Sequence, residues 1–243
     1  MTRTKLGLLG LCAALVGTMA MSVGTAQGAT YKWLILNSSK TTATELKALV
    51  AGKTDSTHLT LEGEVAALKL AITCTSFTPK GINLETGGKV AEGGKMVYTG
   101  CKAYKTAPLT EEYKCTVKSS GVAAGTIETN ELKGVLVSGE SEALMKVEPL
   151  TGPTGNFATV RFEGAECVIP EVNQVHGTIY FKDGEGSLTK HKLEHLIEAD
   201  KKTALYVGGH SAKQLEVTKV LGSAWFPLAG EHVGLEWGVL STP

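Results

Sequence analysis

The chain has no excess of charge of either sign, few aromatic side chains and only seven prolines. Its 24 basic and 24 acidic residues balance, and Phe, Trp and Tyr make up 6% of the 243 residues. A protein with no net charge offers no long-range attraction to a polyanion. The even composition, with 42% hydrophobic residues, also excludes a collagen, a coiled coil, a low-complexity disordered chain and a polytopic membrane protein.

Arginine and aspartate are scarce beyond the first 28 residues. Arg161 is the only arginine there, and Asp55, Asp183 and Asp200 are the only aspartates. Because arginine is the usual side chain for binding phosphates and reading bases, we expect no nucleic-acid partner. Because aspartates are few, calcium-binding loops and catalytic triads that use aspartate are also disfavoured.

The first 28 residues are typical of a cleaved secretory signal peptide. Arg3 and Lys5 precede an apolar run at 6–23, and small residues then allow cleavage after Ala26 or Gly28. An uncleaved anchor is the alternative, since the run is long enough to span a bilayer. The sequence therefore predicts a secreted, extracellular protein with no membrane span after cleavage. We expect residues 29–243, with 22 basic and 24 acidic groups, to form a single β-rich domain.

Four cysteines remain after removal of the signal: Cys74, Cys101, Cys115 and Cys167. An even number in an exported chain predicts two disulfides, for which three connectivities exist. Zinc ligation is less favoured because no C-x-x-C pair occurs. We expect Cys101 to pair with Cys115 across a hairpin closed by the Pro108 loop, and Cys74 to pair with Cys167 between distant strands.

Several segments alternate apolar and polar residues with the period of two that half-buried β-strands show. The clearest are 68–74, 113–118, 160–163 and 233–237, and glycine pairs such as Gly87-Gly88 supply turns between strands. The sequence predicts an all-β fold in which two antiparallel sheets pack as a β-sandwich, with a partly closed β-barrel as the alternative. Helices are expected in two places only, 43–50 and 190–201, and the latter also fits a strand.

The succession of cysteine and glycine landmarks resembles a group of uncharacterised exported proteins of high-GC actinobacteria. The landmarks are Ile72-Thr73-Cys74, Thr99-Gly100-Cys101, Lys114-Cys115-Thr116, the segment 125–136, Cys167, Gly177, Val207-Gly208-Gly209 and Trp237-Gly238. The resemblance implies a β-rich, disulfide-linked extracellular protein. It implies no activity and no functional residues.

The segment His191-Lys192-Leu193-Glu194-His195 matches the zinc-protease pattern H-x-x-E-H. On a helix the two histidines bind zinc and the glutamate activates a water molecule. On a strand, His191 and His195 share one face and Glu194 points away, which destroys the site. We expect no metal and no cofactor, and a zinc-type hydrolase remains an alternative function.

Two other patterns have structural explanations that we favour. The segment 139–143 resembles a nucleophile elbow around Ser141, but its flanking glutamates disfavour an oxyanion, so a hairpin tip explains it better. Trp33 and Trp237 lie in apolar runs and are expected in the core. Trp225 and Phe226 are the candidates for an exposed binding anchor.

These observations predict a non-enzymatic secreted protein that acts by binding or by structure, at the cell surface or in the medium. The expected partner is a protein or a cell-envelope glycan. Besides the zinc-type hydrolase, a second alternative is a self-assembling surface subunit in which the segment Leu68–Cys74 is an edge strand that pairs with a neighbouring molecule.

Overall fold

Strands make up nearly all of the regular structure of this protein. The computed structural model describes residues 30–40, 43–45, 48–49, 51–54, 59–65, 68–105, 111–185, 188, 190–207, 215–216 and 219–242. The described strands form three antiparallel sheets that do not close into a barrel, and two disulfides link them. The prediction of an all-β antiparallel fold with two disulfides is confirmed. The predicted signal peptide lies outside the described residues.

Two of the sheets are small. The three-stranded sheet consists, in order, of β2 (Ala43–Glu45), β1 (Thr30–Leu36) and β22 (Trp237–Thr242). The four-stranded sheet consists, in order, of β10 (Lys102–Tyr104), β6 (Leu68–Cys74), β5 (Leu59–Val65) and β20 (Lys219–Leu221).

The described residues hold no helix that is long and apolar enough to cross a membrane.

The large sheet contains fifteen strands. Its main path is β3 (Ala48–Leu49), β8 (Asn83–Glu85), β9 (Lys89–Thr99), β13 (Leu132–Ser138), β14 (Ala143–Pro149), β16 (Val172–Asp183), β17 (Glu194–Ala199), β21 (Ser223–Pro227) and β4 (Lys53–Thr54). Off this path lie β7 (Ser76–Lys80), β11 (Thr116–Lys118), β12 (Ile127–Glu128), β15 (Asn156–Glu163), β18 (Ala204–Val207) and β19 (Leu215–Glu216). Two short 3-10 turns complete the structure, η1 (Thr86–Gly88) and η2 (Gly230–His232).

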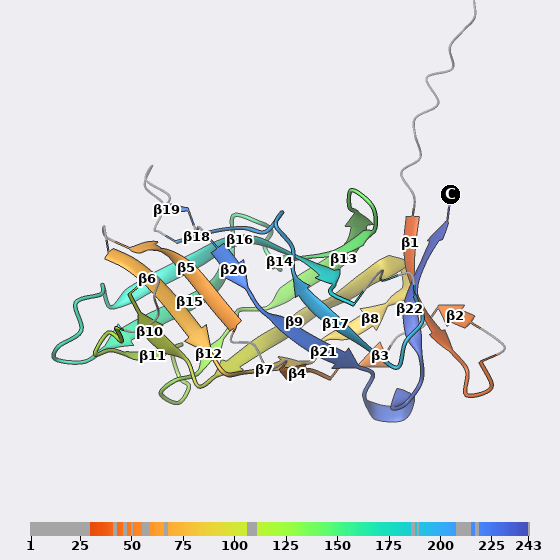
Figure 1. The fold of residues 1–243 in the computed structure, drawn as a ribbon, viewed down its shortest axis with the longest axis horizontal. Helices are drawn as coiled ribbons and strands as arrows, with labels where there is room; N and C mark the ends of the chain where they lie inside the picture. The colour runs from red at the N-terminus through yellow and green to blue at the C-terminus, as the bar shows by residue number, and fades with distance from the viewer. Residues whose placement is uncertain are drawn as a thin grey trace, which may run out of the picture.

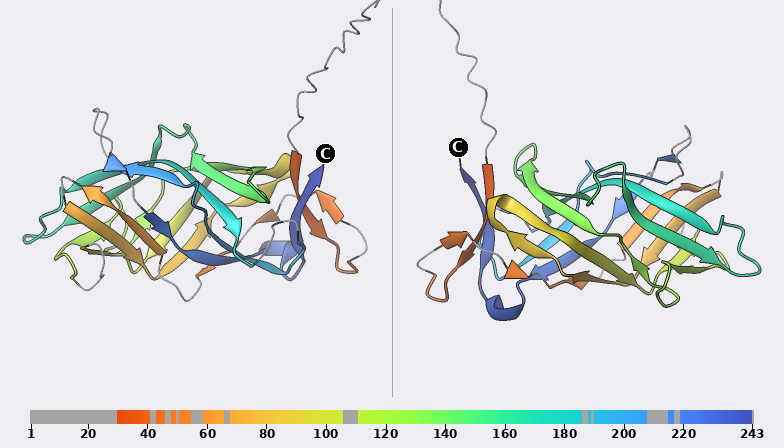
Figure 2. Two further views of the ribbon diagram at one scale, coloured as in Figure 1. Left: turned by 45° about the horizontal axis from the view of Figure 1, so that its top comes forward. Right: turned by 180° about the vertical axis from the view of Figure 1, so that it is seen from behind.

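The described part of the molecule is elongated (Figure 1). The sheet of β1 and β22 stands at one end, and the four-stranded sheet covers part of the large sheet at the other end. The two further views in Figure 2 show the same separation of the two ends. Buried side chains from all three sheets form one continuous apolar core.

Strand β16 connects the two ends because it changes partners along its length. Residues up to Thr178 pair with β15 and β18, whereas Ile179 and later residues pair with β14 and β17. Gly177 lies at the change, with φ +111°, and a Cβ atom there would lie 2.1 Å from the carbonyl oxygen of Ala204. Only glycine fits this conformation and this close approach between strands.

Alternation explains why the segment around residue 160 forms a strand. In β15, buried Val160 and Phe162 alternate with partly exposed Arg161 and Glu163. One face of the strand therefore joins the core, and the other carries charges. The turn between β13 and β14 is closed by a backbone hydrogen bond, in which Gly139 N donates to Glu142 O (2.7 Å). The two strands pair on either side of this turn, which confirms the predicted hairpin.

Strand β6 is an interior strand, so its prediction as an edge strand is wrong. It pairs with β5 on one side and with β10 on the other. Ala71 and Thr73, on the face predicted to be exposed, are also buried. Tyr113, in the segment that pairs with β10, reaches β6 with its hydroxyl, which donates to the carbonyl oxygen of Lys69 (3.0 Å). At residues 71–73, where β10 lies against β6, no edge is free for pairing with a neighbouring molecule.

The disulfides join Cys74 to Cys101 and Cys115 to Cys167, so the predicted pairing is wrong. The expected hairpin does form, since Tyr104 bridges Glu112 across residues 106–110. Cys101 nevertheless pairs with β6, because the register that places Lys102 opposite Thr73 brings Cys74 opposite Cys101. Strand β11 in turn pairs with β15, which brings Cys115 close to Cys167.

Neither predicted helix forms among the described residues. The segment 190–201 contains strand β17, in which buried His195 and Ile197 alternate with exposed Glu194 and half-buried Leu196. Leu193, which a helix over 190–201 would place beside Ile197, precedes the strand and is 51% exposed. The described parts of 43–50 are strands β2 and β3. Pairing with neighbouring strands outweighs the local helical spacing in both places.

Candidate functional site

The H-x-x-E-H segment does not gather its three side chains into one site. Strand β17 begins at Glu194, whose side chain is exposed, while His195 is fully buried. His191 precedes the strand, and its Nδ1 is buried without a hydrogen-bond partner. Among the described residues, no group of three or more His, Cys, Asp or Glu side chains is arranged to hold a metal ion.

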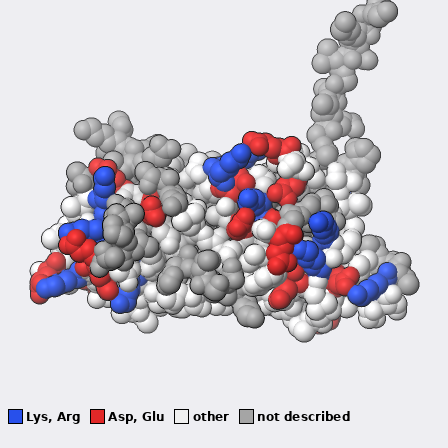
Figure 3. All heavy atoms as spheres, viewed as in Figure 1, with Lys and Arg blue, Asp and Glu red and all other residues white. Residues whose placement is uncertain are grey.

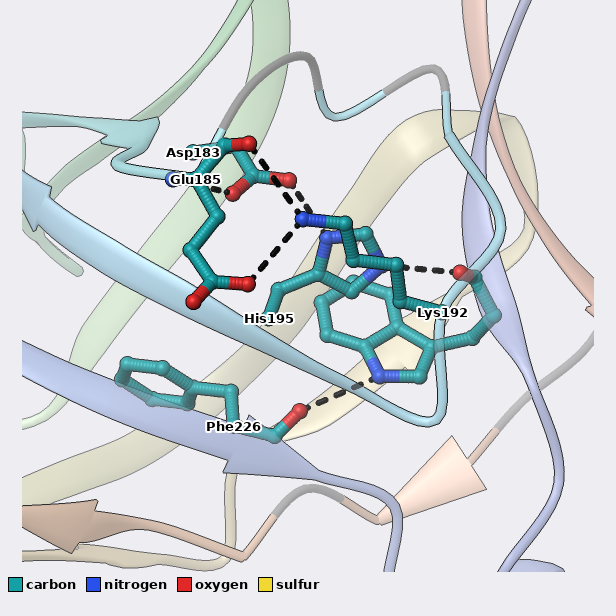
Figure 4. A network of polar contacts seen from close by, with 6 residues as sticks. Asp183, Glu185, Lys192, His195 and Phe226 are labelled. Atoms are coloured by element: carbon teal, nitrogen blue, oxygen red, sulfur yellow. Dashed lines mark hydrogen bonds and ion pairs between the residues drawn. The ribbon is translucent and has the colours of Figure 1, made fainter.

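His195 instead forms a buried network with Asp183 and the backbone of β22 (Figure 4). Its Nδ1 lies within hydrogen-bond distance of Asp183 Oδ2 (2.6 Å), and its Nε2 lies within hydrogen-bond distance of the carbonyl oxygen of Trp237 (2.8 Å). The imidazole also packs against the Trp237 ring, with centroids 4.2 Å apart. Both ring nitrogens therefore face acceptors, and the network ties β16, β17 and β22 together.

The charge on Asp183 is favoured by its partners. Burial alone would raise the pKa of this carboxyl group, but the hydrogen bond from His195 and its charge lower it. The backbone N–H of Glu185 (3.1 Å) and the nearby Lys192 act in the same direction. The net result is a lowered pKa, so Asp183 is a carboxylate that accepts hydrogen bonds from two sides. We assign this network a structural role because both His195 nitrogens are already used.

The tryptophans and Phe226 are mostly part of the core. Trp33 and Trp237 are buried, as predicted, with ring centroids 5.8 Å apart. Phe226 is 6% exposed and packs against Phe77 (5.6 Å), so its prediction as an exposed anchor is wrong. Successive side chains of β21 point to opposite faces, which leaves Trp225 half-buried on the other face.

A cavity of about 120 Å³ lies between the four-stranded sheet and the large sheet. Strands β5, β6 and β20 form one wall, and β9, β12, β15 and β16 form most of the other. The described side chains that line it include no charged group. Leu221, at the end of β20, lines the cavity and is 45% exposed, so the cavity reaches the surface there.

The cavity exists because small residues occupy positions in its walls where neighbouring positions carry large ones. Ala158 lies in β15 beside Phe157, and Ala199 ends β17. Both alanines line the cavity, together with larger side chains such as Phe181. Protein interiors hold few voids larger than a water molecule, so a space of this volume is unusual.

Three residues with hydroxyl groups, Thr60, Tyr98 and Thr129, line the cavity. Thr60 lies opposite Thr73 of β6, so its side chain is on the other face of that sheet from the cavity-lining Ile72 and Cys74. Tyr98 in β9 lies opposite Ile127 in β12, and Thr129 follows β12 directly. Burial raises the pKa of the Tyr98 phenol, so this hydroxyl is neutral at physiological pH. Thr129 is 2% exposed, and its Oγ1 accepts a hydrogen bond from Met96 N (3.0 Å).

The outer surface carries mixed charges. Acidic and basic side chains are intermixed on the face shown in Figure 3. A groove of about 440 Å³ over β9, β13 and β14 is lined by three lysines and three glutamates, and Lys146 and Glu148 in it are 2.7 Å apart. Such alternation creates no field of one sign that would attract a charged ligand.

The residues that line the cavity were not singled out from the sequence. They come from strands far apart in the chain, and none belongs to a recognised motif. The available signal was weak, since Ala158 and Ala199 are small residues within apolar strands. Comparison of the chain with protein-family models, with curated proteins and with solved structures gives no match.

Proposed function

We propose that this chain is a secreted, non-enzymatic binding protein that holds a small apolar molecule between its two facing sheets. The observation that carries the proposal is the uncharged cavity of about 120 Å³. Binding pockets are typically concave and mostly apolar, with a few polar groups that orient the ligand. Binding of a protein or a cell-envelope glycan stays a prediction for the outer surface.

An empty cavity of this volume lowers the stability of the fold. At about 24 cal/mol per Å³, the unfilled space costs roughly 3 kcal/mol. An apolar cavity of about 150 Å³ stays dry and binds benzene, so a cavity slightly smaller than this suits ligands of about the same size. A ligand that fills the cavity recovers part of that lost stability, because it restores contacts to the surrounding side chains.

Secretion is supported by the predicted signal peptide and is compatible with the two disulfides, which persist in oxidising compartments. A non-catalytic role is supported by the lining of the cavity, since its described side chains carry none of the carboxylate or imidazole groups that most general acid–base mechanisms use.

The test compares ligand binding by two variants that carry the same substitution on opposite faces of one sheet. Ala158→Leu places a larger side chain in the cavity, whereas Ala204→Leu adds it at an exposed position of β18. Binding of fluorobenzene is followed by ¹⁹F NMR and by the shift of the thermal unfolding midpoint. We expect saturable binding to the unmodified chain and to Ala204→Leu, and none to Ala158→Leu.

Two outcomes contradict the proposal. The first is absence of saturable fluorobenzene binding to the unmodified, oxidised chain. The second is equal binding by Ala158→Leu, which would place the ligand elsewhere. Circular dichroism of both variants establishes that the sheets have formed, so that lost binding is not the result of unfolding.

A further inference from the structure

Thr129 places an unused hydrogen-bond donor in the cavity wall. Its backbone N–H donates to Met96 O (3.0 Å), and its Oγ1 accepts from Met96 N (3.0 Å). Among the described residues, its hydroxyl hydrogen has no acceptor. The side chain is only 2% exposed and lines the cavity, so a molecule in the cavity can supply the acceptor that this hydrogen lacks.

The neighbouring hydroxyl is already used. Tyr98 shares the inner face of β9 with Met96, and its hydroxyl donates to Met96 Sδ (3.3 Å). Because the Thr60 side chain is on the other face of its sheet, Thr129 is the donor that remains for a ligand among the described residues that line the cavity. Buried donors are costly when they lack an acceptor, and a ligand that supplies one removes this cost.

This inference rests on the proposed function. We propose that the ligand is a neutral, compact and mostly apolar molecule with one acceptor oxygen, such as a small cyclic ketone. Its oxygen accepts a hydrogen bond from the Thr129 hydroxyl. A carboxylate of similar size does not bind, because no described cationic side chain lines the cavity and burial of an unpaired charge is strongly unfavourable.

The first experiment uses the unmodified chain with ¹³C-carbonyl cyclopentanone. A hydrogen bond to the carbonyl oxygen moves the carbonyl carbon resonance downfield from its position in a hydrocarbon solvent. We expect this downfield position for the bound ketone, and no binding of butyrate. Saturable binding with the resonance at its hydrocarbon position would overturn the Thr129 assignment, and so would binding of butyrate as tight as that of the ketone.

The second experiment compares cyclopentanone with methylenecyclopentane, which has the same shape and no acceptor. The ratio of their affinities is measured in the unmodified chain, in Thr129→Ser and in Thr129→Val, so that differences in ligand hydration cancel. One net hydrogen bond corresponds to about fivefold in this ratio. We expect that loss in Thr129→Val and an unchanged ratio in Thr129→Ser, which keeps the hydroxyl.

The outcomes separate the two proposals. Binding of neither cyclic ligand contradicts the proposed function itself. Binding of both with the same affinity ratio in all three proteins contradicts only the role of Thr129. Because Thr129→Val also removes the acceptor of Met96 N–H, its fold is checked by circular dichroism. If it does not fold, the carbonyl resonance in the unmodified chain decides the assignment.

Discussion

Replacement of Asp183 by asparagine tests whether the buried pair with His195 is ionised and how much it stabilises the fold. Both side chains have 0% exposure, and the Nδ1–Oδ2 distance is 2.6 Å. Asparagine has the same shape as aspartate but no charge. Its Oδ1 still accepts from Glu185 N–H, and its Nδ2 donates to the unprotonated Nδ1 of a neutral imidazole, while Nε2 keeps its bond to Trp237 O.

The expected cost is moderate because no buried atom loses its partner. Hydrogen bonds to charged groups contribute about 1.5–3 kcal/mol each, and neutral ones about 0.5–1.5 kcal/mol. Asp183→Asn should therefore lower the free energy of unfolding by about 1–2 kcal/mol. Asp183→Ala leaves His195 Nδ1 and Glu185 N–H without their acceptor, so we expect about 3–5 kcal/mol for it.

The pH dependence gives an independent check of the charge. The pKa of Asp183 is lower in the folded protein than its ordinary value, which is about 3.9 in an unfolded chain. Its contribution to stability is therefore complete above about pH 4, and it is lost as the pH falls through the lowered folded pKa. Asparagine does not titrate, so the part of the difference between the two proteins that comes from the Asp183 charge should shrink in this acidic range.

Urea unfolding followed by circular dichroism, at about pH 7 and in steps below about pH 4, measures both effects. Glu185→Gln is the matched control, because it removes a partly exposed partner of Lys192 (3.2 Å) and should change stability by less than about 1 kcal/mol. A cost of Asp183→Asn below about 0.5 kcal/mol at about pH 7 would refute an ionised pair.

Three further predictions concern the disulfides, Gly177 and the signal peptide. Peptide mapping of the non-reduced protein should give the pairs Cys74–Cys101 and Cys115–Cys167. The double substitution Cys115→Ala/Cys167→Ala should lower the free energy of unfolding, measured in urea, by about 4 kcal/mol, because this disulfide joins residues 52 positions apart. Gly177→Ala should cost about 3 kcal/mol or more in the same assay, while Gly81→Ala, with φ +68° and no atom near its Cβ position, should cost about 1 kcal/mol; equal costs would contradict the contact with Ala204. Protein secreted by a bacterial host should begin at residue 27 or 29 by mass spectrometry, and an intact first residue would contradict the signal peptide.

Local patterns predicted the fold where a strand lies with one face in the core. The alternation around Val160 and the turn between β13 and β14 were read correctly because both depend on nearby residues. The segment Leu68–Cys74 was recognised as a strand, but its burial on both faces was not. Residues distant in the sequence contribute to that burial, since the Tyr113 hydroxyl donates to the carbonyl oxygen of Lys69.

The disulfide pairing shows where local reasoning ends. Cys101 lies between two strands that are both close enough to supply a partner, β6 on one side and the hairpin arm containing Glu112 on the other. Spacing along the chain favoured the hairpin. The register of β10 against β6 decides in favour of Cys74, and register between strands is a property of the assembled sheet.

The cavity could not be predicted because it arises where several positions that are distant in the sequence carry small side chains. An alanine such as Ala158 is ordinary in a core strand, and only the placement of β5 and β20 across from it turns its small size into unfilled space. That opposite wall cannot fill the space from Gly222, since its φ of +149° disfavours any other residue and a Cβ atom there would lie 3.1 Å from Leu59 Cα. A larger side chain at Ala158 or Ala199 of the large sheet can therefore fill the cavity. For this reason, Ala158→Leu distinguishes a cavity that binds a ligand from one that is only a packing defect. If the space has no ligand, filling it should stabilise the protein with no loss of function; if it binds one, the same stabilisation should abolish binding.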